Sequence, residues 1–538
     1  MSGPRRGISP FYPILLALAL VAGLFIGQDM GSSRGGPLAV FQLHQPSASD
    51  KIGQVLDLID QQYVDTVEKN ALVDEVLQDI LQRLDPHSYY ISAAEIRAAQ
   101  EPLEGSFDGI GVEFAIQHDT VVVITPVEGG PSAAVGIRAG DRIVSANGEP
   151  LAGIDITNDQ VMKHLRGPKG SEVVVGIIRH GKAKPFDVTI ERGKIPINSV
   201  AASLLNDDGT GYIKLVRFAK NTHAEFLEAA DALRAKGMKR LVLDLRGNGG
   251  GFLNSAIDLA DEFLPAGRAI VYTEGVHSPR QDANATRKGG YEEIPLAVLI
   301  DEGSASASEI IAGAIQDNDR GILVGRRTFG KGLVQEHVDL PDSSAIRLTT
   351  ARYYTPSGRS IQRPYGEGID YMEDFEARVG HGELLSADSI PTDSAQLFKT
   401  LKGRTVYGGG GVVPDVFVPA DTTETSSYLT ELFFSGTLNQ FAFDVADRDR
   451  VALQARYGNS EQFAKRFSVG TDLLTELEQY AKKQNIVAKP GDVARSRAQI
   501  TARLKAGIAR NVWGDDSYYG ILLEKDPVYL RATGELAK

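Results

Sequence analysis

Apolar residues recur along the chain at different periods, and each period predicts a different kind of element. Between residues 51 and 104 the spacing is helical. Between residues 105 and 192 apolar and polar positions alternate, which is typical of half-buried strands. From residue 193 onward, short apolar runs alternate with helical patterns of about 10–15 residues, which predicts a layered α/β core.

The α/β region yields the most specific elements. A polar interval at 278–290 lacks periodicity and is expected to form a surface flap, and amphipathic patterns near residues 473–481 and 500–508 predict a C-terminal helical domain. The predicted strands of the core are 212–218, 241–245, 270–272, 296–300, 322–325 and 345–354, and the predicted helices are 224–233, 253–263 and 306–316.

The first 30 residues carry a targeting pattern. Arg5 and Arg6 precede an apolar run at 14–26, the order found in export signals. No A-x-A cleavage pattern follows, so we interpret the segment as an uncleaved signal anchor with its positive end inside. This interpretation places the chain on the periplasmic side of the cytoplasmic membrane, anchored at its N-terminus. The alternative is a cleaved signal peptide and a protein soluble in the periplasm.

Length and composition narrow the classes of function. A chain of 538 residues predicts three to four domains. The net charge of −13, without a Lys/Arg-rich block, argues against nucleic acid as a partner. Cysteine is absent, which excludes disulfides, thiolate nucleophiles and cysteine-based metal sites. No cofactor and no metal site are expected.

Ser306 lies where the helix 306–316 is expected to begin. Ser306-x-x-Glu309 has the spacing of a capping box, which satisfies backbone amides and needs no catalysis. The same position lies at the positive end of the helix dipole, where a developing oxyanion would be stabilised. The motif alone favours a cap over a nucleophile.

A lysine between two glycines changes that balance. Lys331 and Gln335 are four residues apart in an extended pattern, so both side chains are expected on one strand face. Burial would lower the pKa of Lys331. The neutral amine could then take the proton of Ser306, with the Gln335 amide oxygen orienting it. An anion-binding or salt-bridging lysine is the alternative.

A glycine run at 247–251 follows the predicted strand 241–245. Glycines let backbone amides approach a ligand closely, so the run could complete an oxyanion hole with the Ala307 amide. A phosphate cradle would need a Gly-Lys-Ser/Thr ending, which is missing. A Ser–His–Asp hydrolase using His337 is a further alternative, although no histidine lies in a G-x-S-x-G or H-E-x-x-H context.

Three motifs stand between residues 105 and 192: Gly109-Ile110-Gly111-Val112, Gly140-Asp141-Arg142-Ile143 and Asn147-Gly148. With these motifs the segment resembles a PDZ domain. The resemblance implies that Ile110, Gly111 and Val112 present backbone amides to a peptide's terminal carboxylate, while the peptide adds to an edge strand. Glycines that only permit a tight turn are the alternative.

Up to about residue 420, the chain resembles the carboxyl-terminal processing proteases, tail-specific serine peptidases of family S41 with a Ser–Lys dyad, and the C-terminal helical domain lies outside the resemblance. With the PDZ segment, the shared motifs span roughly residues 50–420. They are LDPHS at 84–88, LDLRGNGGG at 243–251, GSASASE at 303–309, TFGKGLVQ at 328–335, YTPSGR at 354–359 and GVVPD at 411–415. The resemblance implies a multidomain α/β fold with a crotonase/Clp-like ββα protease core and an inserted PDZ domain.

The resemblance also implies roles for individual residues. Ser306 would be the nucleophile, Lys331 the general base and Gln335 the residue that supports the lysine. The oxyanion donors would be the backbone of Ala307 and of the Gly250 region, and the sequence does not settle which glycine donates. In relatives, a PDZ arginine within an L-R-G segment links peptide binding to activation, and Arg166 occupies that position.

We therefore expect an exported serine endopeptidase that binds protein C-terminal tails through its PDZ domain. Its expected partners are proteins with accessible, apolar C-terminal tails and the inner membrane, and both a homo-oligomer and an adaptor protein are left open. A peptide-binding scaffold with an inactive core and a chaperone-like periplasmic binder are the rivals, and the joint presence of Ser306, Lys331 and Gln335 argues against both. The expected divisions are 1–30 signal anchor, 31–50 linker, 51–104 N-terminal helical region, 105–192 PDZ domain, 193–420 protease core and 421–538 C-terminal helical domain.

Overall fold

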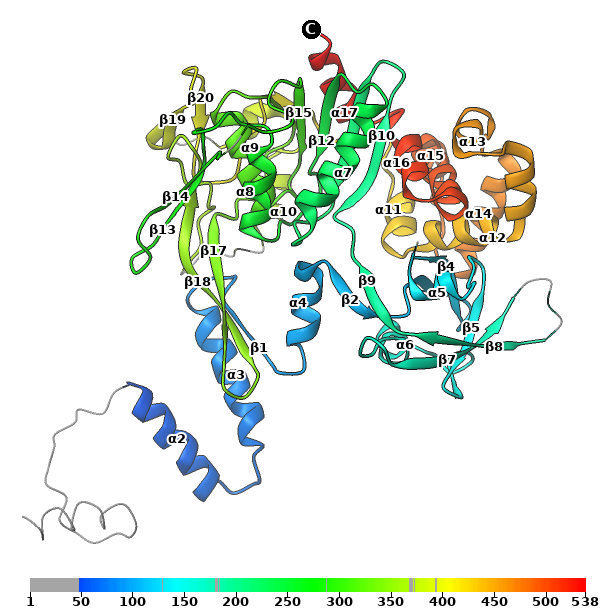
Figure 1. Cartoon of the computed structure of the whole chain (residues 1–538), viewed down its shortest axis with the longest axis horizontal. Coiled ribbons are helices and arrows are strands. Elements are labelled where there is room, and N and C mark those ends of the chain that lie inside the picture. The colour runs from blue at the N-terminus through cyan, green and yellow to red at the C-terminus, as the bar shows by residue number, and fades with distance from the viewer. Residues whose placement is uncertain are drawn as a thin grey trace, which may run out of the picture. The chain divides into compact units, whose positions relative to one another are not determined.

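The protease region is built around a six-stranded sheet (Figure 1). The first pair of strands is antiparallel and the other pairings are parallel. Long apolar runs form its central strands, as predicted, because both faces of the sheet are covered. In spatial order the strands are β10 (Val200–Leu205), β11 (Thr210–Leu215), β12 (Arg240–Asp244), β15 (Leu296–Ile300), β16 (Ile322–Gly325) and β21 (Val416–Phe417).

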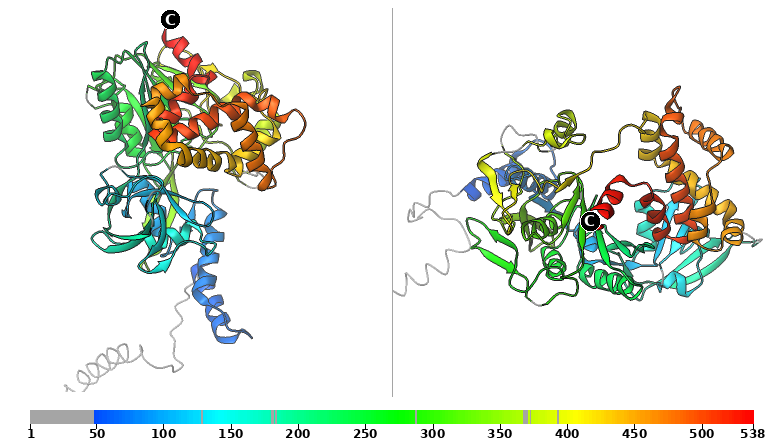
Figure 2. Two further views of the ribbon diagram at one scale, coloured as in Figure 1. Left: turned by 90° about the vertical axis from the view of Figure 1, so that its right-hand side faces the viewer. Right: turned by 90° about the horizontal axis from the view of Figure 1, so that it is seen from above.

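Alternate residues of the central strands face two separate apolar layers. Leu243 and Val298 belong to a buried cluster shared with three helices, α7 (Thr222–Ala235), α8 (Leu253–Asp261) and α9 (Ala307–Asp317). Val242 and Leu299 belong to a second cluster, which includes Val528 of the last helix, α17 (Pro527–Leu536). The C-terminal end of the chain therefore packs on the core sheet (Figures 1 and 2).

A computed structural model describes residues 48–127, 129–179, 182, 184–286, 288–366, 371, 373–391 and 394–538. The predicted signal anchor, residues 1–30, lies outside these ranges. Within them, no helix is long and apolar enough to cross a membrane. The chain divides into two compact units, residues 1–73 and 74–538.

Helices dominate the described part of the N-terminal region. The first unit contains α2 (Ala48–Gln62). The next helices are α3 (Lys69–Gln82) and α4 (Ile96–Glu104), with the short strand β1 (Tyr89–Ile91) between them. The two helical patterns recognised between residues 51 and 84 thus correspond to α2 and α3.

A second, antiparallel sheet carries part of the candidate site. It places β17 (Leu333–Asp339) beside the long β18 (Ala345–Tyr354), which also pairs with β1. β18 pairs further with β13 (Ala269–Glu274), and β13 pairs with β14 (Gln281–Asn284). The interval 278–290, which we expected to form a surface flap, therefore contains a strand that its lack of periodicity did not predict. Hairpin pairing forms it, and its mostly exposed polar residues give no apolar period.

Residues 106–196 form a β-rich body. α5 (Pro131–Ala134) and α6 (Asn158–Leu165) accompany its main sheet, and the ribbon of β2 (Ser106–Gly109) and β9 (Gly193–Pro196) adjoins it. The main sheet has the order β3 (Val112–Ile116), β4 (Val121–Pro126), β5 (Arg142–Ala146), β7 (Glu172–Ile178) and β8 (Phe186–Glu191), and β6 (Glu149–Pro150) pairs with β5.

The C-terminal region is helical, as predicted, and has an apolar core of its own. The predicted patterns at 473–481 and 500–508 lie in α14 (Thr471–Lys483) and α15 (Asp492–Trp513). The other helices are α11 (Ser427–Phe434), α12 (Thr437–Tyr457), α13 (Ser460–Arg466) and α16 (Asp515–Leu523). Between the core strands and this region lie α10 (Asp374–Gly380), the 3-10 turns Ala387–Ser389 and Ser394–Gln396, β19 (Leu397–Lys399) and β20 (Thr405–Tyr407).

Candidate active site

Ser306 is the residue that caps the N-terminus of α9. It has φ 54° and ψ −114°, a conformation that costs energy for a non-glycine residue and is often retained at functional sites. The predicted capping box is present, and the Ser306 amide donates to Glu309 Oε2 at 2.8 Å. The strained turn after β15 therefore holds the serine at the start of the helix.

Lys331 and Gln335 meet as predicted. Lys331 Nζ donates to Gln335 Oε1 at 3.0 Å, although Lys331 precedes β17 and only Gln335 lies in the strand. Burial lowers the pKa of the Lys331 amine, and the positive charge of Arg347 lowers it further. Asp85 and Glu309 act in the opposite direction, but the net shift favours the neutral amine.

The loop of the LDPHS motif fixes the other end of Gln335. Gln335 Nε2 donates to the backbone oxygen of His87. The buried Asp85 carboxylate shapes this loop, because it accepts from the His87 and Ser88 amides, each at 2.8 Å, and from Ser88 Oγ at 2.6 Å. Burial and the nearby Lys331 charge lower the pKa of His87 to about 4, so its ring is neutral at pH 7.

Glu309 is a buried carboxylate with four donors. Ser306, Gly330 and Lys331 donate their backbone amides at 2.8, 2.8 and 2.9 Å, and Thr328 donates its hydroxyl at 2.6 Å. Burial raises the pKa of Glu309 to about 7, although these hydrogen bonds favour the ionised form. The spacing to Ser306 gave a signal for one of these contacts, but the other three come from a distant segment.

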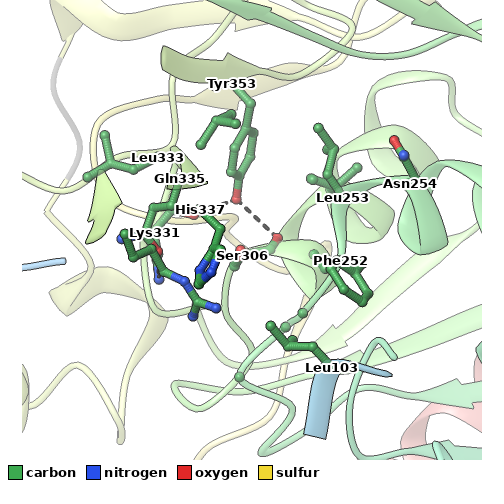
Figure 3. A pocket seen from close by; sticks show the side chains of 17 residues that line it. Leu103, Phe252, Leu253, Asn254, Ser306, Lys331, Leu333, Gln335, His337 and Tyr353 are labelled. Atoms are coloured by element: carbon green, nitrogen blue, oxygen red, sulfur yellow. Dashed lines mark hydrogen bonds between the residues drawn. The ribbon is translucent and has the colours of Figure 1, made fainter. Parts of the chain in front are cut away.

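Tyr353 forms a second link between the same two segments. Its buried hydroxyl lies 3.0 Å from the Ser306 backbone oxygen and 2.5 Å from that of Lys331 (Figure 3). Tyr353 belongs to β18, and nothing in the sequence distinguished it from Tyr354, the other tyrosine of that strand. Glu309 and Tyr353 together connect the peptide units of Ser306 and Lys331 on both their amide and carbonyl sides.

The glycine run lies against the serine. Gly250 has φ 98°, and a Cβ added there would come within 2.8 Å of both the Ala305 backbone oxygen and Ser306 Cβ. Only glycine fits this approach. The Gly250 amide donates to Asn248 Oδ1 at 2.9 Å, whereas Ala307 is the first residue of α9, where amides lack intrahelical acceptors.

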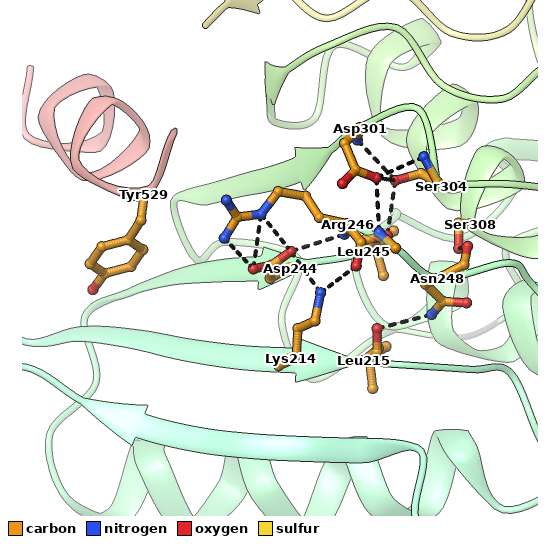
Figure 4. A network of polar contacts seen from close by, with 12 residues as sticks. Lys214, Leu215, Asp244, Leu245, Arg246, Asn248, Asp301, Ser304, Ser308 and Tyr529 are labelled. Atoms are coloured by element: carbon orange, nitrogen blue, oxygen red, sulfur yellow. Dashed lines mark hydrogen bonds and ion pairs between the residues drawn. The ribbon is translucent and has the colours of Figure 1, made fainter. Parts of the chain in front are cut away.

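An ion-pair network holds the strand that leads into the glycine run (Figure 4). The fully buried Asp244 carboxylate accepts from Tyr212 at 2.8 Å, from Lys214 at 3.2 Å and from Arg246 at 2.6 Å. Burial alone would raise the pKa of Asp244, but the charges of Arg246 and Lys214 outweigh it and hold the pKa well below its usual range. Arg246 also pairs with Asp526, which caps α17, at 2.8 Å.

The run itself is fastened to both neighbouring strands. Gly247 donates its amide to Asp301 Oδ1 at 2.8 Å, and Asn248 Nδ2 donates to the Leu215 backbone oxygen at 3.0 Å. The Asn248 backbone oxygen accepts from the Ala305 amide at 3.0 Å and from Ser308 Oγ at 2.8 Å (Figure 4). The loop and the start of α9 therefore form one hydrogen-bonded structure.

Ser306, Lys331, Gln335 and Gly250 line one cavity of about 560 Å³. In Figure 3, Ser306 lies between Lys331 and Gln335 on one side and Phe252 and Leu253 on the other. No hydrogen bond joins Ser306 Oγ to Lys331 Nζ in this conformation, although both residues line the cavity. The apolar lining consists of Leu103, Phe252, Leu253, Ala307, Ile310, Leu333, Val334 and Tyr353, and the charged or titratable lining adds Lys331, His337 and Arg347.

His337, the alternative base, lies on β17 at the edge of this cavity. Its Nε2 atom is 3.0 Å from Asp339 Oδ1 and 3.2 Å from Gln100 Nε2. The structure gives no hydrogen bond between His337 and Ser306. A histidine–carboxylate pair is therefore present, but its hydrogen bonds go to Asp339 and Gln100 and not to the serine.

The residues predicted to bind a peptide lie at the start of an edge strand. Ile110 is buried in the core of the β-rich body, Gly111 has φ 73°, and Val112 begins β3. β3 is the terminal strand of its sheet and pairs there only with β4 among the described strands. That free edge is the feature that strand addition requires.

Arg166 connects this body to a helix beside the cavity. Its guanidinium donates to Glu101 of α4 at 2.5 Å and lies 4.4 Å from the Phe107 ring centroid. Leu103, two residues along α4, lines the candidate active site. A path of direct contacts thus runs from the C-terminal end of α6 to the cavity.

Known families account for most of the chain. The model for peptidase family S41 matches residues 209–371, and the PDZ domain model matches residues 109–190. A carboxy-terminal-processing protease of Bartonella bacilliformis is 34% identical over 378 residues, which cover 69% of this chain and 84% of that protein. The chain belongs to peptidase family S41. This serine peptidase is of the carboxy-terminal processing type, as its motifs predicted, and it carries a PDZ domain.

The chain is also similar to other proteins of known name. The carboxy-terminal processing protease CtpB of Bacillus subtilis is 35% identical over 321 residues, covering 59% of this S41 peptidase and 66% of CtpB. The solved photosystem II D1 C-terminal processing protease is 27% identical, with a TM-score of 0.36, over 69% of this chain and 92% of that one. Residues 428–514 match a family of unknown function. The helical region that follows the peptidase core is thus a recurring unit without an assigned role.

Proposed function

We propose that this S41 peptidase cleaves peptide bonds with Ser306 as nucleophile, Lys331 as general base and Gln335 as the support of the lysine. One observation carries the proposal: Lys331 Nζ donates to Gln335 Oε1 at 3.0 Å within the cavity that Ser306 also lines. The direction of the pKa shift of Lys331 supports it, because only the neutral amine can accept a proton.

In the acylation step, Ser306 Oγ attacks the carbonyl carbon of the scissile bond while Lys331 Nζ takes the hydroxyl proton. The carbonyl oxygen becomes an oxyanion, and amides at the start of α9 and in the glycine run stabilise it. We assign the Ala307 amide and a donor from the Gly250 region. The lysine then protonates the leaving amine, the C–N bond breaks, and the N-terminal part of the substrate remains as an ester on Ser306.

In the second step, Lys331 takes a proton from water, and the hydroxide attacks the ester. The bond to Ser306 Oγ breaks, the serine regains a proton from the lysine, and the product leaves as a carboxylate. Proton transfer needs Ser306 Oγ and Lys331 Nζ within hydrogen-bond reach, and such contacts often form only with substrate bound. We therefore infer that the Lys331 side chain moves toward Ser306 when a peptide enters.

We propose that the PDZ domain selects substrates by their C-terminal tails. The tail would pair with the free edge of β3, and amides near Ile110, Gly111 and Val112 would receive its carboxylate. Arg166 would couple peptide binding at the PDZ domain to the active-site cavity through its contact with Glu101 of α4. The apolar lining beside Ser306 supports an apolar substrate residue next to the scissile bond.

The N-terminal pattern supports an exported, membrane-anchored enzyme on the periplasmic side. Fractionation of cells that express the full chain, with and without residues 1–30, tests this proposal. We expect the full chain in the carbonate-washed membrane and the shortened chain in the cytosol. A full chain that stays in the cytosol would contradict export, and a processed chain in the soluble periplasm would replace the anchor by a cleaved signal.

Incubation with an unstructured protein that carries an apolar C-terminal tail, and with the same protein lacking the tail, tests the enzymatic proposal. We expect rapid cleavage of the protein with the tail and much slower cleavage of the protein without it. Binding without cleavage would identify an inactive scaffold. Protection of a denatured client without cleavage would identify a chaperone-like binder.

A further inference from the structure

Arg347 brings a guanidinium into the cavity that Ser306 and Lys331 line. It lies on β18, directly opposite His337 of β17, and two residues from Thr349, which opposes Gln335. Residues two apart on a strand share one face, so Arg347 projects from the same face of the sheet as Gln335 and His337. All three side chains line the cavity with Ser306.

No carboxylate of the described residues forms an ion pair with Arg347. Its guanidinium donates to the Tyr89 hydroxyl at 3.0 Å, a neutral partner, and lies 5.6 Å from that ring's centroid. Tyr89 thus holds the guanidinium in place but does not neutralise it, and the charge of Arg347 remains available to the cavity.

The charge of Arg347 opposes the effect of two carboxylates on Lys331. Asp85 and Glu309 both favour the ammonium form of the lysine, and the structure needs both carboxylates for hydrogen bonds to backbone amides. His87 is neutral and supplies no compensating charge. Burial and the charge of Arg347 are the two influences that lower the pKa of Lys331 and so favour the free amine.

We propose that Arg347 is a positioning residue that acts through Lys331, with its unpaired guanidinium offsetting Asp85 and Glu309 so that the lysine is present as the free amine that accepts the Ser306 proton. The inference rests on the proposed Ser–Lys dyad. It assigns Arg347 no contact with the reacting atoms.

The test compares pH profiles of kcat/KM for the parent, Arg347→Gln and Arg347→Lys. We expect Arg347→Gln to move the acidic limb upward by on the order of half to one pH unit, so that activity on that limb falls about 3- to 10-fold. The plateau at high pH should change far less, and Arg347→Lys should restore the limb. Arg352→Gln, from the same strand but outside the cavity, is the matched control.

A second measurement follows Lys331 alone, because Glu309 also titrates near neutral pH. Only the free amine reacts with an acylating reagent, so the pH dependence of Lys331 labelling, read by peptide mass spectrometry, reports its own pKa. We expect the labelling midpoint to rise in Arg347→Gln together with the acidic limb. If Arg347→Gln folds poorly, Arg347→Met supplies a second neutral variant.

Suppose that Arg347→Gln is folded and active, and that neither the pH midpoint of the acidic limb nor the pH midpoint of Lys331 labelling changes. That result would overturn the inference and leave the dyad intact. A rise in KM with both midpoints unmoved would also overturn it and would identify Arg347 as a substrate contact. Failure of the dyad has a different signature, since Lys331→Ala would then retain activity whatever the behaviour of Arg347.

Discussion

Ser306 and Lys331 share one hydrogen-bond acceptor: Glu309 Oε2 receives the amide of Ser306 at 2.8 Å and the amide of Lys331 at 2.9 Å. The two residues are 25 positions apart in the chain: Ser306 caps α9, and Lys331 precedes β17. Tyr353 connects their backbone oxygens as well. The distance between the proposed nucleophile and base is thus fixed through the backbone, and their side chains remain free to rearrange.

Replacement of Glu309 by glutamine should impair turnover more than substrate binding. The side-chain amide of glutamine would direct an N–H group at backbone amides that also donate. Loss of a hydrogen bond to a charged acceptor costs about 1.5–3 kcal/mol. We expect kcat to fall by roughly 10- to 100-fold with little change in KM. Steady-state kinetics of Glu309→Gln measure this. Glu336→Gln, a substitution of an exposed glutamate of β17, is the control. Parent-like kcat would contradict a positioning role.

The raised pKa of Glu309 also predicts how stability depends on pH. The folded state binds this proton more tightly than the unfolded state, so the contribution is fully present below about pH 4.5 and is lost as pH rises through about 7. We expect the opening free energy of α9, from hydrogen exchange corrected for intrinsic rates, to fall by up to about 3 kcal/mol between pH 5 and pH 8. Glu309→Gln should lack this decrease, and an equal decrease in both proteins would contradict the assignment.

Gly250 should tolerate no side chain. An alanine there would combine φ 98° with a Cβ 2.8 Å from Ser306 Cβ, so either the glycine run or the serine must shift. We expect Gly250→Ala to lose at least about 100-fold in kcat/KM, because the oxyanion donors and the nucleophile would separate. Gly249→Ala is the comparison, since its added Cβ meets no atom within 4 Å. Similar losses in both variants would show that any substitution in the run is harmful.

Asp526 extends the site's support to the last helix. Its carboxylate pairs with Arg246 and accepts from the Val528 and Tyr529 amides at the start of α17. We expect Asp526→Ala to lower stability by about 1–2 kcal/mol through the lost cap and to lower activity through Arg246. Asp526→Ser keeps a cap but loses the charge, so it should recover stability and not activity. Thermal unfolding and kinetics of the two variants together separate these effects.

The sequence predicted correctly those elements whose pattern lies within one short segment. The apolar run 296–300 and the spacing from Ser306 to Glu309 each lie within one short segment, and both gave the correct local structure. The family motifs likewise identified the peptidase. The strand β14 was missed because its exposed polar residues form a hairpin without an apolar period.

Contacts between residues far apart in the chain could not be predicted from the sequence. The backbone oxygen of His87 supports Gln335 from 248 positions away, and any residue type could supply it. Arg347 reaches the cavity because of the β17–β18 register, which includes an irregularity between Val334 and Gln335 that no residue pattern announces. Lys331 was expected within the strand, yet β17 begins at Leu333, and the side chain nevertheless reaches Gln335.

Removal of the Lys331 amine tests the central claim most directly. Single-turnover cleavage of a tailed, unstructured substrate should be measured for the parent, Ser306→Ala and Lys331→Ala, with circular dichroism to verify folding. The proposed dyad predicts that both variants fold and that each loses at least about 10³-fold in the rate of cleavage, because the nucleophile and its base act as one unit. Near-parental cleavage by Lys331→Ala would contradict the account.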